Sequence, residues 1–139
     1  MDKIKIYLAG PISTEDSLEE ANRFREEAKK KLMFWNIGTL NPLRHKKENK
    51  QYRPQEIVER DEMDIRRADA ILCNYKDKSH RYIGTSMEIM YAHLHEIPVF
   101  VISDWADEHY WINYHATQVF SNLEEAAVYI KEFFDYDSF

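Results

Sequence analysis

Residues 70–92 carry the sequence AILCNYKDKSHRYIGTSMEIMYA, and this stretch decides the fold. Its apolar start, 70–75, is typical of a buried strand, and the polar loop after it leads into a helical segment around Glu88. A carboxylate in the first turn of a helix that follows a parallel strand lies where α/β proteins bind ligands. Thr85 and Glu88 also fit a capping box, which would be a structural role.

The same alternation of apolar runs and helical segments continues through the chain. We expect strands at 4–9, 38–40, 70–75, 99–103 and 119–120. Helices are expected from N-cap candidates at 13–17 to Trp35, at 54–68, around Glu88 and at 123–134. This order predicts an α/β, flavodoxin-like or Rossmann-like three-layer fold with a mostly parallel five-stranded sheet, in one domain over 1–139.

Composition narrows the possible partners and the compartment. A net charge of -6 argues against nucleic acid as the main partner. Cys73 is the single cysteine, so no internal disulfide can form, and its apolar neighbours favour a buried packing role. No apolar run is long enough for a membrane helix or the core of a signal peptide, so we expect a soluble cytoplasmic protein without a membrane partner.

Several cofactor-dependent chemistries lack their motifs. The first strand-to-helix turn holds one glycine, Gly10, so the dinucleotide fingerprint is absent, as is a phosphate-binding Walker loop. The histidines show no zinc-binding spacing, and no nucleophile elbow around a serine exists. We therefore expect neither a metal nor an organic cofactor.

A second carboxylate stands out in the helix expected at 54–68. Val58, Asp61, Ile65 and Ala68 share one helical face, so Asp61 interrupts an apolar stripe. An inward carboxylate either finds hydrogen-bond donors or keeps its proton through desolvation, and the second outcome makes a general acid. Asp64 is nearer the edge of the stripe and is a weaker candidate.

Two carboxylates with different protonation states suit the cleavage of glycosidic bonds. One attacks the anomeric carbon while the other protonates the leaving group, and an N-glycosidic bond poses the same electronic problem. Glu88 as nucleophile and Asp61 as acid would meet both demands.

These residues also resemble the nucleoside 2-deoxyribosyltransferase family, which includes 2'-deoxynucleoside 5'-phosphate N-hydrolases. The similarity rests on residues 6–11 (IYLAGP), on Arg60-Asp61 followed eight residues later by Asp69-Ala70, and on residues 84–92 (GTSMEIMYA). The three segments occur in the family's order and span most of the chain.

The resemblance implies roles for individual residues. Glu88 matches the glutamate that forms a deoxyribosyl-enzyme intermediate, and Asp61 matches the aspartate that contacts the base and handles its proton. Tyr7 matches a tyrosine that orients the glutamate, and Gly10 lies in the loop below the sugar. Asn113 falls where a neighbouring subunit donates a polar residue toward the 5' end, which implies a homo-oligomer with sites completed across subunits.

Further candidate substrate contacts surround these positions: Ile12, Ser13, Asn41, Arg44, Asp64, Tyr82 and Gly84. Tyr82 stands six positions before Glu88, where the resemblance implies an acidic residue in transferases of free nucleosides and serine in the nucleotide hydrolases. Tyr82 matches neither. The basic loops at 44–47 and 76–81 would suit a 5'-phosphate, whereas Asn113 favours an uncharged hydroxyl.

Three interpretations of the function follow. We favour a transferase that moves 2-deoxyribose between bases, with a small-molecule nucleoside or nucleotide and a free base as partners. The first alternative is hydrolysis of deoxynucleoside 5'-monophosphates at the same site. The second is a non-catalytic nucleotide-binding domain, suggested by the aromatic segment 105–114 as a partner surface.

Overall fold

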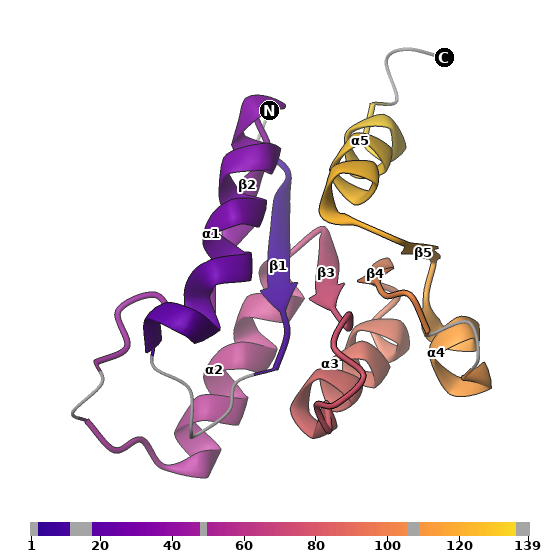
Figure 1. Cartoon of the computed structure of the whole chain (residues 1–139). Helices are drawn as coiled ribbons and strands as arrows, with labels where there is room; N and C mark the ends of the chain where they lie inside the picture. The colour runs from indigo at the N-terminus through magenta and orange to yellow at the C-terminus, as the bar shows by residue number, and fades with distance from the viewer. Residues whose placement is uncertain (1–2, 12–17, 48–49, 106–108, 136–139) are drawn as a thin grey trace.

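Five parallel strands form one sheet in the order β2-β1-β3-β4-β5 (Figure 1). The strands are β1 Lys5–Ala9, β2 Gly38–Leu40, β3 Ala70–Asn74, β4 Val99–Ile102 and β5 Gln118–Phe120. The computed structural model describes residues 3–11, 18–47, 50–105 and 109–135. This strand order is that of flavodoxin-like folds and confirms the predicted architecture.

Helices cover both faces of the sheet and complete three layers. They are α1 Leu18–Phe34, α2 Pro54–Arg67, α3 Ile83–Leu94, α4 Tyr110–His115 and α5 Leu123–Phe133. Helices α1 and α5 supply Leu32 and Ile130 to the hydrophobic cluster on one face. Helices α2, α3 and α4 supply Ile65, Ile89 and Ile112 to the cluster on the other face.

The central strands are apolar throughout because they are buried on both faces. In β1 the residues from Ile6 to Ala9 are fully buried, and in β3 those from Ala70 to Cys73 are too. Their side chains alternate between the two clusters, with Ile6 and Leu8 on the α1 side and Tyr7 on the α3 side. Strand β1 therefore presents Tyr7 to the helices that carry Glu88 and Asp61.

The expected capping box at Thr85 and Glu88 is wrong. Helix α3 begins two residues earlier, at Ile83, and its N-cap is Tyr82 in a left-handed conformation with φ 51° and no side-chain cap. The Tyr82 ring is buried and stacks on Tyr75, with ring centroids 4.0 Å apart, which fixes the helix start before Thr85. Glu88 thus lies in the second turn, free of a capping role.

Two other expectations need correction. Val58 does not belong to the inward stripe of α2, because its side chain is 54% exposed, and the half-buried Ile57 lies inward in its place. The short helix α4 was not expected, since six residues are too few for a helical period to stand out.

Among the described residues, no helix has both the length and the hydropathy needed to span a membrane. Ile12 and Ser13 lie outside the described residues.

Truncating the central strand should strongly destabilise the fold. Leu72 is fully buried in β3, between β1 and β4, so we expect Leu72→Ala to lower the free energy of unfolding by about 2–5 kcal/mol. Urea denaturation measures the loss. The matched control is Val128→Ala in α5, where the side chain is 46% exposed and the change should stay within about 0.5 kcal/mol. Equal losses in both variants would contradict the proposed core.

Candidate active site

The candidate site lies where the strand order reverses, at the carboxyl ends of β1 and β3. After β1 the chain continues to β2 on one side of β1, and after β2 it crosses to β3 on the other side. The loops that follow β1 and β3 therefore diverge, and a crevice opens between them. Gly10 follows β1 directly, and an added Cβ there would lie 3.4 Å from the Asn74 Cβ at the end of β3. The two strand ends are therefore in van der Waals reach of each other, and α2 and α3 flank them.

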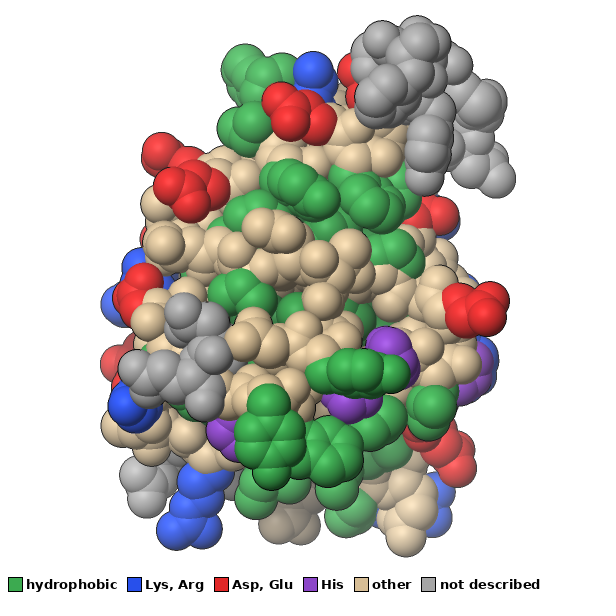
Figure 2. Space-filling model, turned by 90° about the vertical axis from the view of Figure 1, so that its right-hand side faces the viewer, with side chains coloured by type: hydrophobic (Ala, Val, Ile, Leu, Met, Phe, Trp, Pro, Cys, Tyr) green, Lys and Arg blue, Asp and Glu red, His purple; other side chains and the backbone are tan. Residues whose placement is uncertain are grey.

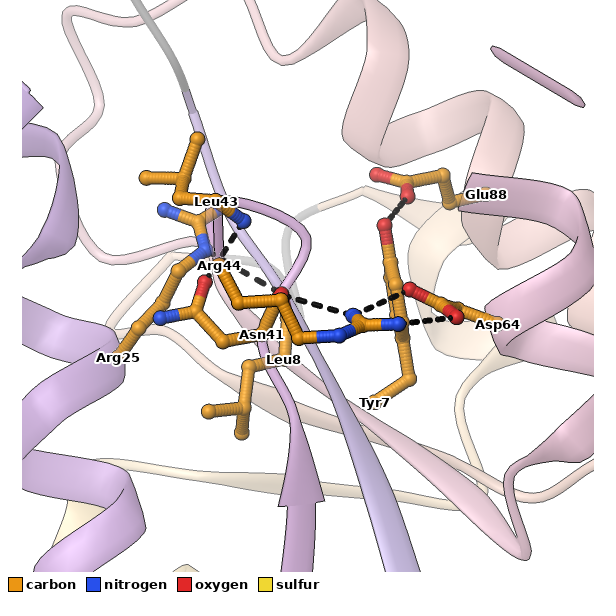
Figure 3. Close-up of polar contacts among 8 residues, drawn as sticks. All are labelled: Tyr7, Leu8, Arg25, Asn41, Leu43, Arg44, Asp64 and Glu88. Carbon is orange, nitrogen blue, oxygen red and sulfur yellow. Dashed lines mark hydrogen bonds and ion pairs between the residues drawn. The ribbon is translucent and has the colours of Figure 1, made fainter. Parts of the chain in front are cut away.

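Tyr7 and Glu88 form the central contact of this site. The Tyr7 hydroxyl donates a hydrogen bond to Glu88 Oε2 across the face of the sheet (Figure 3). Burial raises the pKa of Tyr7 well above its ordinary value, and the neighbouring carboxylates Glu88 and Asp61 raise it further. Tyr7 consequently remains a protonated donor at every physiological pH, and no hydrogen bond from the described residues occupies Glu88 Oε1.

Glu88 has a pKa in the neutral range. Burial raises its pKa to about 7, while the hydrogen bond from Tyr7 lowers it. Asp61 raises the pKa, and the cations Arg25 and Lys46 lower it. A carboxylate that is poorly solvated yet still ionised in a large share of the molecules is a strong base and nucleophile.

Asp61 lies on α2 beside this pair and is half-buried. Burial raises its pKa and Asp64 adds to the increase, while Lys46, Arg25 and Arg60 lower it. The negative charge of Asp61 in turn raises the pKa of Glu88, so ionisation of one carboxyl disfavours ionisation of the other. Both carboxyls therefore hold their protons more strongly than a solvated carboxyl does.

A cavity of about 120 Å³ opens next to Asp61. Its walls combine apolar side chains (Pro42, Ile57, Met63) with charged ones (Arg44, Lys46, Arg60, Asp61, Asp64, Arg67). Arg44 binds Asp64 through two parallel hydrogen bonds of 2.6 and 2.7 Å (Figure 3). Asp64 is buried, contrary to its expected place at the edge of the stripe, and Arg44 compensates its charge.

Asn41 and Gly84 take different places around the site. The Asn41 side chain donates to Asn22 Oδ1 at 2.6 Å and accepts from the Leu43 amide at 2.9 Å, so it fixes the turn after β2. Gly84 lies one helical turn before Glu88 on the same side of α3. An added Cβ at Gly84 would meet no atom within 4 Å, so the space there is open to a ligand.

Tyr82 and Asn113 are away from the carboxylates. Tyr82 is packed against Tyr75 and Trp105, and burial raises its pKa to about 12. Asn113 is exposed on α4, which packs against α3. Within this single chain the structure therefore brings together Tyr7, Gly10, Asp61 and Glu88, but leaves Tyr82 and Asn113 outside that group.

One buried charge at the site was missed from the sequence. Arg25 on α1 is only 2% exposed, and Glu88, Asp61 and Tyr7 all raise its pKa, which burial lowers. A signal was present: Arg25 stands four residues after Ala21, three before Ala28 and seven before Leu32, on the apolar face of the helix. The described residues contain no group of three or more His, Cys, Asp or Glu side chains that could hold a metal ion.

Comparison with known proteins gives one matching family model. The model for nucleoside 2-deoxyribosyltransferase matches residues 6–130. The matched range includes Tyr7, Asp61 and Glu88. The search of curated proteins finds no match.

Solved structures share the fold at low sequence identity. A conserved protein from Enterococcus faecalis V583 has a TM-score of 0.69 at 18% identity, over 94% of this chain and 99% of that one. The 2-deoxyribosyltransferase from Bacillus psychrosaccharolyticus also has a TM-score of 0.69, at 19% identity over 96% and 94% of the two chains. The enzyme from Leishmania mexicana, a 2-desoxiribosyltransferase, has a TM-score of 0.68 at 19% identity, over 93% and 97%.

Ionisation of Glu88 should cost stability. Its pKa is about 7 in the folded protein and ordinarily 4.5, so the folded state binds more protons between these limits and stability falls as the pH rises through them. We therefore expect Glu88→Gln to stabilise the protein at about pH 8 by up to about 3 kcal/mol. The gain should vanish as the pH falls below about 4.5, where the carboxyl is mostly protonated in both the folded and the unfolded protein.

Urea unfolding at several pH values measures this difference. The control is Glu132→Gln, which changes an exposed carboxylate on α5. A stabilisation by Glu88→Gln that is independent of pH, or equal in the control, would rule out the assigned ionisation.

Proposed function

The chain belongs to the nucleoside 2-deoxyribosyltransferase family, which is enzymatic, and we propose that it cleaves 2'-deoxynucleosides and transfers deoxyribose to another base. The observation that carries the proposal is the partly buried Tyr7–Glu88 hydrogen bond with Asp61 beside it. Because the family is enzymatic, we no longer propose that the chain is a non-catalytic nucleotide-binding domain.

In the first step, Glu88 Oε1 attacks the anomeric carbon while the bond to the base nitrogen breaks. The carboxyl proton of Asp61 passes to the departing base, so the base leaves neutral and Asp61 becomes ionised. Tyr7 holds the other oxygen of Glu88 and so directs Oε1 toward the sugar. The product is a deoxyribosyl ester of Glu88 and a free base.

In the second step, the nitrogen of an incoming base attacks the same carbon and releases Glu88. The proton that this nitrogen loses returns to Asp61, which restores the starting state. The cavity beside Asp61 supports this assignment, because Pro42, Ile57 and Met63 give it apolar walls for a planar ring. Arg44, held by Asp64, lies at its edge and is our candidate for a contact to the base.

The alternative is hydrolysis of deoxynucleoside 5'-monophosphates, with water as the acceptor. The cations Arg44, Lys46, Arg60 and Arg67 around the cavity support this version, because they would attract a phosphate. The buried Tyr82 supports it too, since its position lacks the acidic residue that the resemblance implies for transferases of free nucleosides. Comparing the turnover of deoxynucleosides with that of their 5'-monophosphates separates the two versions.

We also propose that the chain acts as a homo-oligomer. Large apolar side chains are exposed on α3 and α4: Ile83, Met87, Leu94, Tyr110, Trp111 and Tyr114. Figure 2, which faces the side that carries α4, shows hydrophobic and histidine side chains gathered low on the surface. Asn113 lies among these residues, so the same contact would bring it to a neighbouring subunit's site.

The transferase version predicts base exchange. Incubating the protein with deoxyinosine and free adenine should give deoxyadenosine, which chromatography detects. Glu88→Ala should lower the rate by at least about 10³-fold, whereas Glu132→Ala on the exposed side of α5 should leave it unchanged. Release of hypoxanthine with no deoxyadenosine would refute transfer and leave hydrolysis. Full activity of Glu88→Ala would refute both.

The proton-donor role of Asp61 predicts a dependence on the leaving group. Asp61→Asn should slow cleavage of deoxyinosine by about 10²–10⁴-fold, because the base then leaves without a proton. Cleavage of 7-methyl-2'-deoxyguanosine, whose base is already cationic, should be much less affected. Glu59→Gln, an exposed change on the same helix, is the control. An equal loss with both substrates would show that Asp61 does not protonate the base.

A further inference from the structure

Helix α1 carries an arginine, Arg25, that is only 2% exposed. Arg25 donates from Nε to the Leu8 carbonyl at 3.3 Å, from Nη2 to the Gly10 carbonyl at 3.0 Å and from Nη1 to the Ala21 carbonyl at 2.8 Å. In the described part of the chain, no ion pair joins it to a carboxylate. A buried charge costs several kcal/mol unless something compensates it, so its retention needs a reason.

The sequence of the neighbouring strand explains the bond to Leu8. The Ile4 carbonyl accepts from the Gly38 amide, and in a parallel ladder every second carbonyl of β1 points to the same side. The pairing of β1 with β2 ends at Tyr7 and Leu40, so residue 42 would be the next donor toward Leu8. That residue is Pro42, which has no N–H. The Arg25 guanidinium supplies the missing donor to Leu8 (Figure 3). It also donates to the Gly10 carbonyl two residues further on.

The hydrogen bond from Arg25 to Leu8 holds the residue that follows Tyr7, the donor to Glu88. Tyr7 directly precedes Leu8, so the guanidinium fixes the backbone from which the Tyr7 hydroxyl reaches Glu88. An added Cβ at Gly10 would lie 3.6 Å from Arg25 Nη2, so the turn after β1 rests against the guanidinium.

The positive charge of Arg25 also faces the acidic groups of the site. It lowers the pKa of Glu88, of Asp61 and of Tyr7. The titratable and charged groups that act on Glu88 come from five parts of the chain: Tyr7 on β1, Arg25 on α1, Lys46 in the loop after β2, Asp61 on α2 and Cys73 on β3. Of the two cations, Lys46 is half-buried at the cavity and Arg25 is buried, so water screens Arg25 less.

We propose that Arg25 is a positioning residue: its guanidinium holds the end of β1 through the Leu8 and Gly10 carbonyls and supplies the buried positive charge that the Tyr7, Glu88 and Asp61 group faces. It contacts neither the sugar nor the base. The effect of Arg25 on catalysis rests on the proposed function of Glu88. The effect of its charge on the pKa of Glu88 is a property of the folded protein alone.

The electrostatic part is tested without turnover. Carboxyl carbons of ¹³C-labelled glutamate are followed by NMR against pH, and the Glu88 signal is assigned by its loss in Glu88→Gln. Arg25→Met should raise the pKa of Glu88 by about 1–3 units, as expected when a nearby opposite charge is removed. Arg23→Met, an exposed change on the same helix, should leave it unmoved. A folded Arg25→Met variant with the wild-type titration would overturn the proposal.

The geometric part is tested by Arg25→Lys, which keeps the charge but loses the planar fork. This variant also serves where Arg25→Met does not fold. We expect Glu88 to titrate within about half a unit of wild type, while kcat falls by about 10-fold or more and KM changes little. Wild-type kcat would contradict the anchoring role, and a strongly raised pKa of Glu88 in this variant would contradict the charge role.

The two proposals fail in different ways. If the wild-type protein neither exchanges nor releases bases, the proposed function is wrong, and the NMR titration still decides whether Arg25 controls Glu88. Suppose instead that wild type is active and that the apparent pKa of the acid limb of the kcat/KM profile is no higher in Arg25→Met than in wild type. The proposed role of Arg25 is then wrong, while the proposed function of Glu88 is unaffected.

Discussion

The hydrogen bond from the Tyr7 hydroxyl to Glu88 joins the middle of the sheet to α3, and the polar part of the structure is arranged around it. Burying a carboxylate at this place is unfavourable, and burial is the main cause that raises the pKa of Glu88 to about 7. The donor on β1 and the cations Arg25 and Lys46 compensate part of it. Among the described residues Glu88 has no ion-pair partner within salt-bridge distance, so the Tyr7 hydroxyl and the more distant cations provide the compensation.

The strand order explains why these groups meet at one point. Between β1 and β3 the sheet reverses its winding, so the loops after the two strands diverge and leave room at their carboxyl ends. Tyr7 comes from β1, and α2 and α3, which flank the crevice, bring Asp61 and Glu88. On the opposite side of the sheet, α1 inserts Arg25 beneath the turn at Gly10. The site is therefore assembled from both layers of helices.

Local patterns predicted most elements but failed where side-chain packing decides. The five strands and four of the helices lie close to their expected ranges, because continuous apolar runs and a helical period are local properties. The start of α3 was misplaced since the stacking of Tyr82 on Tyr75, and not a capping side chain, fixes it. In α2 the inward face is rotated away from Val58, because the paired Asp64 is buried in place of an apolar residue.

The sequence by itself determined the alternation of strands and helices, the family, and the pair of carboxylates that stand out from their surroundings. Those properties depend on residue type and spacing along the chain. Only the tertiary structure decided that Tyr7 donates to Glu88, that Arg44 neutralises Asp64 and that Arg25 is buried under the end of β1. Protonation and charge compensation depend on burial and on distances between groups far apart in the chain, which spacing alone does not fix.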